Sequence, residues 1–142
     1  MLDFWAILGG LALSMGLSFL AGLVVGIADG MGMLRQAPDL LETEGEEELE
    51  ELERRLARDL RNDTTFHIGT LIISLLAQVL AGYYTALWAD FSPWLHAGLM
   101  GALAVAITFL FDWRKYAPAW VMWAWVFLAV PASLAGAWMI ID

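Results

Sequence analysis

Two histidines are the first residues to consider, because side chains that carry chemistry are scarce in this sequence. An imidazole can bind a metal ion or haem iron. His67 opens one long apolar run directly after a charged segment, whereas His96 opens the next run after the Ser92–Pro93 pair. Consecutive membrane helices start on opposite sides of an apolar layer about 30 Å thick, so no single metal ion reaches both. The sequence therefore predicts no metal site and no cofactor held by both histidines.

Four ionisable residues form a second candidate group. Asp29 and Asp112 each follow an apolar run, and Arg114 and Lys115 come directly after Asp112. Nothing ionisable falls near the middle of a run, where an ion path or proton relay would need it. We therefore expect an ion pair among these four at the inner membrane face. Gln78 is the one strongly polar side chain at mid-depth, and we expect it to be an interhelical hydrogen-bond anchor.

Several classes of chemistry are disfavoured by what the sequence lacks. It has no cysteine, which excludes disulfides and thiolate metal sites. Nucleophile–base arrangements, glycine-rich phosphate loops and the His-Glu-x-x-His zinc motif are all absent. The formal net charge of −9, without a basic stripe, argues against nucleic acid as a partner. The sequence predicts no catalytic residue and a non-enzymatic protein.

An aromatic face is the remaining candidate for a bound small molecule. Trp120, Trp123 and Phe127 share one side of a helix because they recur at spacings of three and four. Such a surface can accept a quinone, a pigment or a lipid, although an aromatic belt at the membrane boundary has the same composition. We favour the belt. No cofactor is predicted, and bound lipid, quinone or pigment stays open.

The most specific pattern is a small residue at every fourth position of the first apolar run. In lipid, helices associate by close approach over small side chains. We interpret the pattern as one flat face along the whole helix that binds a second copy or another membrane subunit. The alternative is packing within the chain, against a matching face formed by Gly98, Ala102 and Ala106. The pattern comprises Ala6, Gly10, Ser14, Ser18, Gly22, Gly26 and Gly30.

Four long uncharged runs must position these residues. The chain of 142 residues is 61% hydrophobic and only 16% charged, whereas soluble domains are about half apolar and about one quarter charged. Each run is long enough to cross the hydrocarbon core as a helix. The sequence thus predicts an all-α fold, an integral membrane four-helix bundle in one domain. The expected spans are residues 4–28, 64–89, 91–111 and 116–141.

An acidic segment, residues 39–63, separates the first two runs and contains eleven of the sixteen acids. Thr43 to Glu46 has the pattern of a capping box, and Glu50–Arg54 and Glu51–Arg55 have the i,i+4 spacing of helical ion pairs. We expect a short cytoplasmic amphipathic helix here. It offers a docking surface for a cytoplasmic partner, although a solvated charged face is the commoner use. Its apolar stripe consists of Leu49, Leu52, Leu56 and Leu60.

Orientation follows from the seven basic residues, all of which fall in two of the connecting segments. Basic residues concentrate in cytoplasmic loops. We therefore expect residues 29–63 and 112–115 in the cytoplasm and both termini outside, in a prokaryotic inner membrane. The basic residues are Arg35, Arg54, Arg55, Arg58, Arg61, Arg114 and Lys115.

Residues 81–86 (AGYYTA) and 92–101 (SPWLHAGLMG) resemble a helical hairpin of poorly characterised small bacterial membrane proteins. In that hairpin a Gly-Tyr pair ends one helix, and a Leu-His pair followed by small residues opens the next. The resemblance covers about twenty of the 142 residues. It implies a prokaryotic four-helix membrane protein and carries no assigned activity.

Taken together, these patterns predict a non-enzymatic accessory or scaffold subunit of a larger membrane complex, associating through the small-residue face of the first helix. Its expected partners are membrane lipids and either other membrane subunits or further copies of itself. One alternative is a small homo-oligomeric channel or transporter, with Ser14 and Ser18 as sparse polar lining. Another is a membrane protein that binds lipid or quinone.

Overall fold

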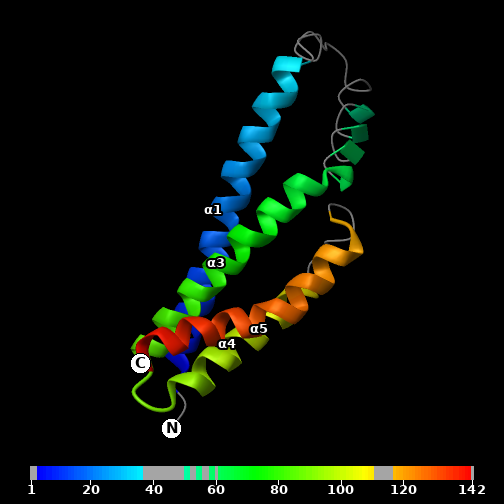
Figure 1. Ribbon diagram of the computed structural model, residues 1–142. Coiled ribbons are helices and arrows are strands. Elements are labelled where there is room, and N and C mark those ends of the chain that lie inside the picture. The colour runs from blue at the N-terminus through cyan, green and yellow to red at the C-terminus, as the bar shows by residue number, and fades with distance from the viewer. Residues whose placement is uncertain are drawn as a thin grey trace.

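The computed structural model describes residues 3–36, 50–51, 54–55, 58–59, 61–110 and 117–141. These residues form an all-helical structure with four main helices (Figure 1). The helices are α1 (Phe4–Gln36), α3 (Thr64–Trp88), α4 (Pro93–Thr108) and α5 (Ala119–Ile141). The described residues between 50 and 62 are also helical.

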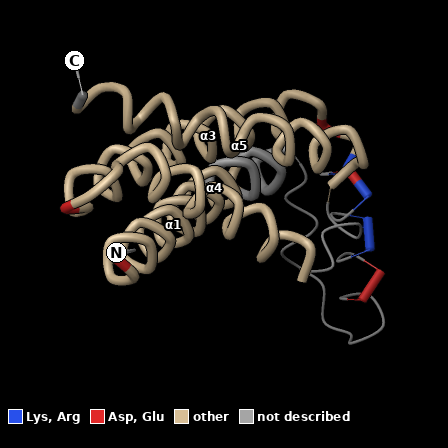
Figure 2. Tube along the Cα trace, turned by 90° about the horizontal axis from the view of Figure 1, so that it is seen from below, with Lys and Arg blue, Asp and Glu red and all other residues tan. Residues whose placement is uncertain are grey.

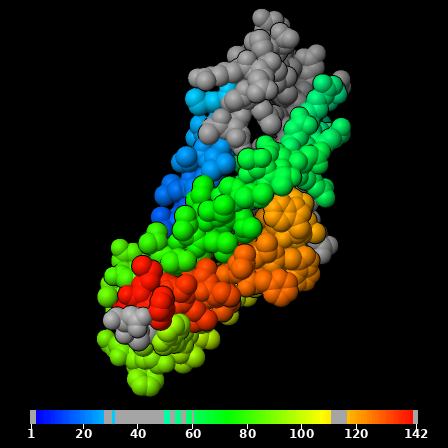
Figure 3. Space-filling model, in the orientation of Figure 1, coloured from blue at the N-terminus to red at the C-terminus, as the bar shows by residue number. Residues whose placement is uncertain are grey.

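Helix α3 is the centre of the bundle, since it packs against α1, α4 and α5. The starts of α1 and α4 gather at one end of the bundle with the ends of α3 and α5 (Figure 1). Away from this end α1 diverges from the other helices. In Figure 3, α1 and the first half of α3 extend beyond the region that α4 and α5 cover. We call the end where the four helices meet the closed end, and the opposite end the open end.

The helices differ in length more than the uncharged runs do. Three of them, α1, α3 and α5, are long and apolar enough to cross a membrane by length and composition. Helix α1 has 33 residues and continues to Gln36, past the end of the first run. Helix α4 has only 16 residues, against the 21 of the expected span 91–111. At 1.5 Å per residue it extends about 24 Å, which is shorter than a hydrocarbon core.

Two helix starts show how local sequence sets these boundaries. Before α3, Asp63 is a side-chain N-cap, because its carboxylate accepts a hydrogen bond of 3.0 Å from the backbone N–H of Phe66. Before α4, Pro93 occupies the first turn, where its missing N–H costs no bond. Ser92 has the position of an N-cap but a left-handed backbone with φ 49° and no capping hydrogen bond. A serine at this position therefore suggests a capping hydrogen bond that its side chain does not form.

Close approach between helices depends on small residues. A Cβ at Gly82 of α3 would overlap the backbone of Ser133 in α5, and a Cβ at Gly136 of α5 would overlap the backbone of Val79 and Tyr83. The two backbones therefore cross almost in contact, as expected where helices associate without a hydrophobic drive between them.

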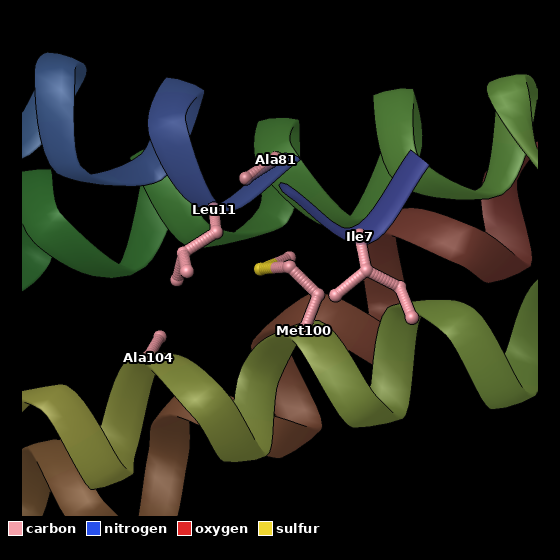
Figure 4. Packing of buried hydrophobic residues seen from close by; sticks show 5 residues of the cluster. All are labelled: Ile7, Leu11, Ala81, Met100 and Ala104. Carbon is pink, nitrogen blue, oxygen red and sulfur yellow. The ribbon is translucent and has the colours of Figure 1, made fainter. Parts of the chain in front are cut away.

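Apolar packing joins α1 to α3 and α4. Ile7 and Leu11 of α1 point towards Met100 and Ala104 of α4, with Ala81 of α3 beside them (Figure 4). All five residues are buried. This cluster fixes only the first turns of α1, which explains why the rest of that helix is free to diverge.

Candidate functional site: the two halves of α1

The first half of the small-residue pattern on α1 packs within the chain. A Cβ at Gly10 would overlap the hydroxyl oxygen of Thr85 and lie 3.2 Å from the carbonyl oxygen of Ala81. Thr85 itself is fully buried and donates its hydroxyl to the same Ala81 carbonyl at 2.8 Å. Only glycine at position 10 leaves room for this contact, and Ala6 one turn earlier is also buried.

A buried polar link follows one turn further along α1. The hydroxyl of Ser14 donates to Oε1 of Gln78 at 2.5 Å, and Nε2 of Gln78 lies 3.5 Å from the sulfur of Met100. Gln78 is 0% exposed, so its carboxamide joins α1, α3 and α4 at one point. The prediction that Gln78 anchors an interhelical hydrogen bond is confirmed. Because the hydroxyl of Ser14 is buried and donates to Gln78, it does not line a pore.

The second half of the pattern has no such contacts. Ser18 and Gly22 are half-buried and Gly26 is exposed. A Cβ at Gly22 or Gly26 would meet no atom of the described residues within 4 Å. The small residues of α1 therefore divide at Ser18 into a packed half and an open half.

Helix geometry explains the division. Four residues of an α-helix turn through about 400°, so a residue repeated every fourth position drifts by about 40° per step. Between Gly10 and Gly26 the drift reaches about 160°. The stripe winds around α1, and the interpretation of one flat face along the whole helix is wrong for a helix of regular pitch. Gly10 faces α3, whereas Gly26 points away from it.

Beside the open half lies an apolar groove between α1 and α3, with a volume of about 400 Å³. It begins where α1 leaves the bundle, just beyond the Ser14–Gln78 link. Aliphatic side chains line it and give it no polar partner for a ligand to recognise. The lining residues are Leu17, Leu20, Ala21, Val24, Val25, Ile73, Leu76, Ala77 and Leu80.

Both histidines are buried and hydrogen-bonded to backbone groups. Nε2 of His67 lies 3.1 Å from the carbonyl oxygen of Arg61. His96 contacts the backbone N–H of Asp3 and the carbonyl oxygen of Ser92. The contact with Asp3 escaped the sequence analysis, because it joins residues 93 positions apart. Among the described residues, no group of three or more histidines, aspartates or glutamates could hold a metal ion.

The described residues between 50 and 62 lie at the open end, next to the start of α3 (Figure 1), and Figure 2 shows the arginines among them in blue. Arg54 donates to Glu50 at 3.4 Å and Arg55 to Glu51 at 2.6 Å, which are the two ion pairs expected from their spacing. The hydrogen bond and the charge of Arg55 lower the pKa of Glu51, and Glu51 raises the pKa of Arg55. All four side chains are exposed, so this pairing has little effect on stability.

The aromatic residues singled out on α5 share an exposed surface. Trp123 and Phe127 stack with ring centroids 6.1 Å apart, and Phe127 is 70% exposed. Trp120 is exposed as well. These rings are not part of the groove between α1 and α3. Trp125 points elsewhere and donates its indole N–H to the hydroxyl of Thr108 on α4 at 3.0 Å.

Some predicted features lie outside the described residues. This applies to the surroundings of Asp29 and Gly30, whose backbone is part of α1. It applies also to Asp112, Arg114 and Lys115, and hence to the expected inner-face ion pair. The capping box and the leucine stripe of the acidic segment, Leu49, Leu52, Leu56 and Leu60, lie outside them too.

Comparison with known proteins adds no relative from which a function could be transferred. The chain matches no family model, and neither a curated protein nor a solved structure is significantly similar to it.

Proposed function

We propose that the chain is an integral membrane protein that crosses a prokaryotic inner membrane four times, with both termini outside. The three long apolar helices support insertion. The shorter α4 packs between α3 and α5, and locally thinned lipid or residues beyond its helical part can accommodate its length. The arginines described at the open end support a cytoplasmic position for that end.

Within this membrane the chain acts as a non-enzymatic accessory or scaffold subunit of a larger complex. The observation that carries this proposal is the unequal use of the small residues on α1. Gly10 and Ser14 are occupied by α3, whereas Gly22 and Gly26 have open space around them. In lipid a small-residue surface of this kind promotes association with another helix.

The geometry constrains how a partner helix would pack. Residues four apart form rows inclined to the helix axis, and helices that meet along such rows cross at about −40° to −50°. A helix that follows Ser18, Gly22 and Gly26 would thus cross α1 obliquely. Because these residues point away from the groove side of α1, the partner can pack there without displacing α3.

Gentle extraction from the native membrane tests this proposal. We expect a complex heavier than the 15.7 kDa chain, containing a second membrane protein in fixed stoichiometry. The double variant Gly22→Leu with Gly26→Leu should release that partner and leave the monomer folded. Gly16→Leu is the matched control, since Gly16 is also open and helical but lies off the small-residue stripe. The control should retain the partner.

Other results would replace the proposal. A complex containing only this chain would support the homo-oligomeric channel or transporter, which ion-flux measurements would then examine. A lone chain carrying stoichiometric lipid or quinone would support the binding protein instead, with the face of Trp120, Trp123 and Phe127 as the first region to mutate. Equal partner loss in the control and the double variant would show that the stripe is not the interface.

A further inference from the structure

His96 connects the start of α1 to the start of α4. Its side chain is 0% exposed. Nε2 lies 2.7 Å from the backbone nitrogen of Asp3, and Nδ1 lies 3.0 Å from the carbonyl oxygen of Ser92. Both ring nitrogens are thus used, one towards each helix start.

The two partners determine the protonation state of the ring. The Asp3 nitrogen carries a proton and can only donate, so Nε2 must be the unprotonated acceptor. The Ser92 carbonyl can only accept, so Nδ1 must carry the proton. Both bonds can therefore form together only with the proton on Nδ1 and none on Nε2, and the opposite tautomer would break both.

Asp3 has a second role that depends on this bond. Its carboxylate Oδ1 lies 3.1 Å from the backbone nitrogen of Trp5 and 3.3 Å from that of Ala6, so it caps the first turn of α1. The backbone of Asp3 is tied to His96 while its side chain is tied to α1. The contact therefore holds a capped helix end against α4.

Protonation of His96 is incompatible with this arrangement. A proton on Nε2 would face the N–H of Asp3, placing two donors 2.7 Å apart in place of a hydrogen bond. The imidazolium would instead attract the Asp3 carboxylate, which would have to leave the N–H groups of Trp5 and Ala6 to reach it. Histidine is the side chain whose charge changes closest to neutral pH.

We propose that His96 is an acid-sensitive latch: when neutral it holds the capped first turn of α1 against α4, and when protonated it releases the cap by drawing the Asp3 carboxylate away from the N–H groups of Trp5 and Ala6. The charged groups around it are few. Asp3 faces it from the start of α1, and Asp90 lies in the link before α4. The end of α3 carries Tyr83 and Tyr84, and the described part of α5 has no charged residue. The terminal Asp142 follows α5 outside the described residues.

The state of the ring can be measured directly on the full chain in lipid nanodiscs. Nitrogen NMR of ¹⁵N-labelled histidine should show, at pH 7.5, a neutral His96 protonated on Nδ1 and accepting at Nε2. Acidification should protonate Nε2. Observation of the Nε2–H tautomer at pH 7.5, or of a ring that stays neutral down to pH 4, would refute the latch.

Release of the Asp3 cap is tested by a second measurement. Amide hydrogen exchange at Trp5 and Ala6, corrected for the intrinsic effect of pH, should accelerate at least about fivefold as His96 protonates, the change typical of a lost N-cap. In His96→Gln, an amide oxygen can accept from Asp3 without titrating, so the acceleration should disappear. The control His67→Gln removes the other histidine and should retain it.

Two outcomes would contradict release. In the unmodified chain, protonation of His96 without faster exchange at Trp5 and Ala6 would show that the contact is not a latch, whether or not His96→Gln folds. Persistence of the full pH response in a folded His96→Gln protein would assign the response to another group. The proposal does not rest on the partner of α1, because the latch involves contacts within the chain alone.

Discussion

The two halves of α1 have the same sequence pattern and opposite surroundings. Between Ala6 and Ser14 the small residues lie against α3, with the Gly10–Thr85 contact and the Ser14–Gln78 hydrogen bond as the closest points. Beyond Ser18 the same spacing continues, but Gly22 and Gly26 face open space, and other residues of α1 line the aliphatic groove. A repeated small residue therefore predicts that close approach is possible; whether it happens depends on the direction in which each residue faces and on the neighbouring helix.

The side chains that α3 presents to α1 explain why the open half does not pack against α3. The packed half has matching groups on α3, namely Thr85, Ala81 and Gln78, each within reach of a small residue on α1. Towards the open end α3 presents Ile73 and Leu76, whose bulk lines the groove. Because lipid tails are as apolar as these side chains, burying them inside the protein has little advantage in a membrane.

Glycine-to-leucine substitutions in the two halves should give the largest contrast. Gly10→Leu would force a side chain into Thr85 and the Ala81 carbonyl, so we expect a loss of at least about 1–3 kcal/mol of stability, the usual cost of overpacking. Gly22→Leu should change the stability of the isolated chain by much less, since its Cβ meets nothing. Reversible unfolding in mixed micelles measures both. Equal destabilisation would show that α1 packs along its whole length.

A smaller effect should come from the polar link at the boundary between the halves. Ser14→Ala and Gln78→Leu remove the two partners of the 2.5 Å hydrogen bond. A double-mutant cycle should give a coupling of about 0.6 kcal/mol, the average for such bonds in membranes. Replacing Ser14→Ala with Ser18→Ala in the cycle should remove the coupling. A coupling with Ser18 as large as that with Ser14 would move the boundary towards the open end.

The smallest effect concerns the charged segment at the open end. Arg55 holds the pKa of Glu51 below its ordinary value of 4.5. The pairing thus stabilises local helix above that pH and is lost as the pH falls through the lowered pKa. In Arg55→Gln the pKa of Glu51 should rise, as measured by carboxyl ¹³C NMR. Arg54→Gln should raise it less, because Arg54 pairs with Glu50 and influences Glu51 only through its charge. If Arg54→Gln raised the pKa of Glu51 more than Arg55→Gln did, the ion pairing of Glu51 in lipid would differ from the pairing described here.

Much of the fold could be predicted from the sequence, because uncharged runs, isolated polar residues and i,i+4 spacings can all be recognised within short segments. Long uncharged runs mark the helices, with α3 beginning at Thr64 as expected and ending one residue early at Trp88. A lone polar residue in such a run needs a partner in lipid, which correctly identified Gln78. The ion pairs of Arg54 and Arg55 follow from spacing alone.

The features that could not be predicted depend on relations between distant segments. The place where α1 leaves the bundle lies just beyond the bond between Ser14 and Gln78, two residues 64 positions apart. The hydrogen bond between Asp3 and His96 spans 93 positions, and neither residue type specifies the other. The early end of α4 at Thr108 coincides with its contact to Trp125 of α5, again a tertiary relation. For Ser92, the backbone geometry of the link overrides the usual capping preference of its side chain.

The wide sequence separation of the α1 contacts has a consequence for biosynthesis. Ser14 cannot form its hydrogen bond until Gln78, 64 residues later, has been synthesised. Asp3 likewise depends on His96, 93 residues later. At a synthesis rate of about 5–20 residues per second, the first helix, which ends at Gln36, is complete roughly 2–12 s before these partners are made. During that interval neither half of its small-residue stripe is covered by the chain itself. The nascent helix therefore offers a membrane chaperone a longer surface than the finished protein does.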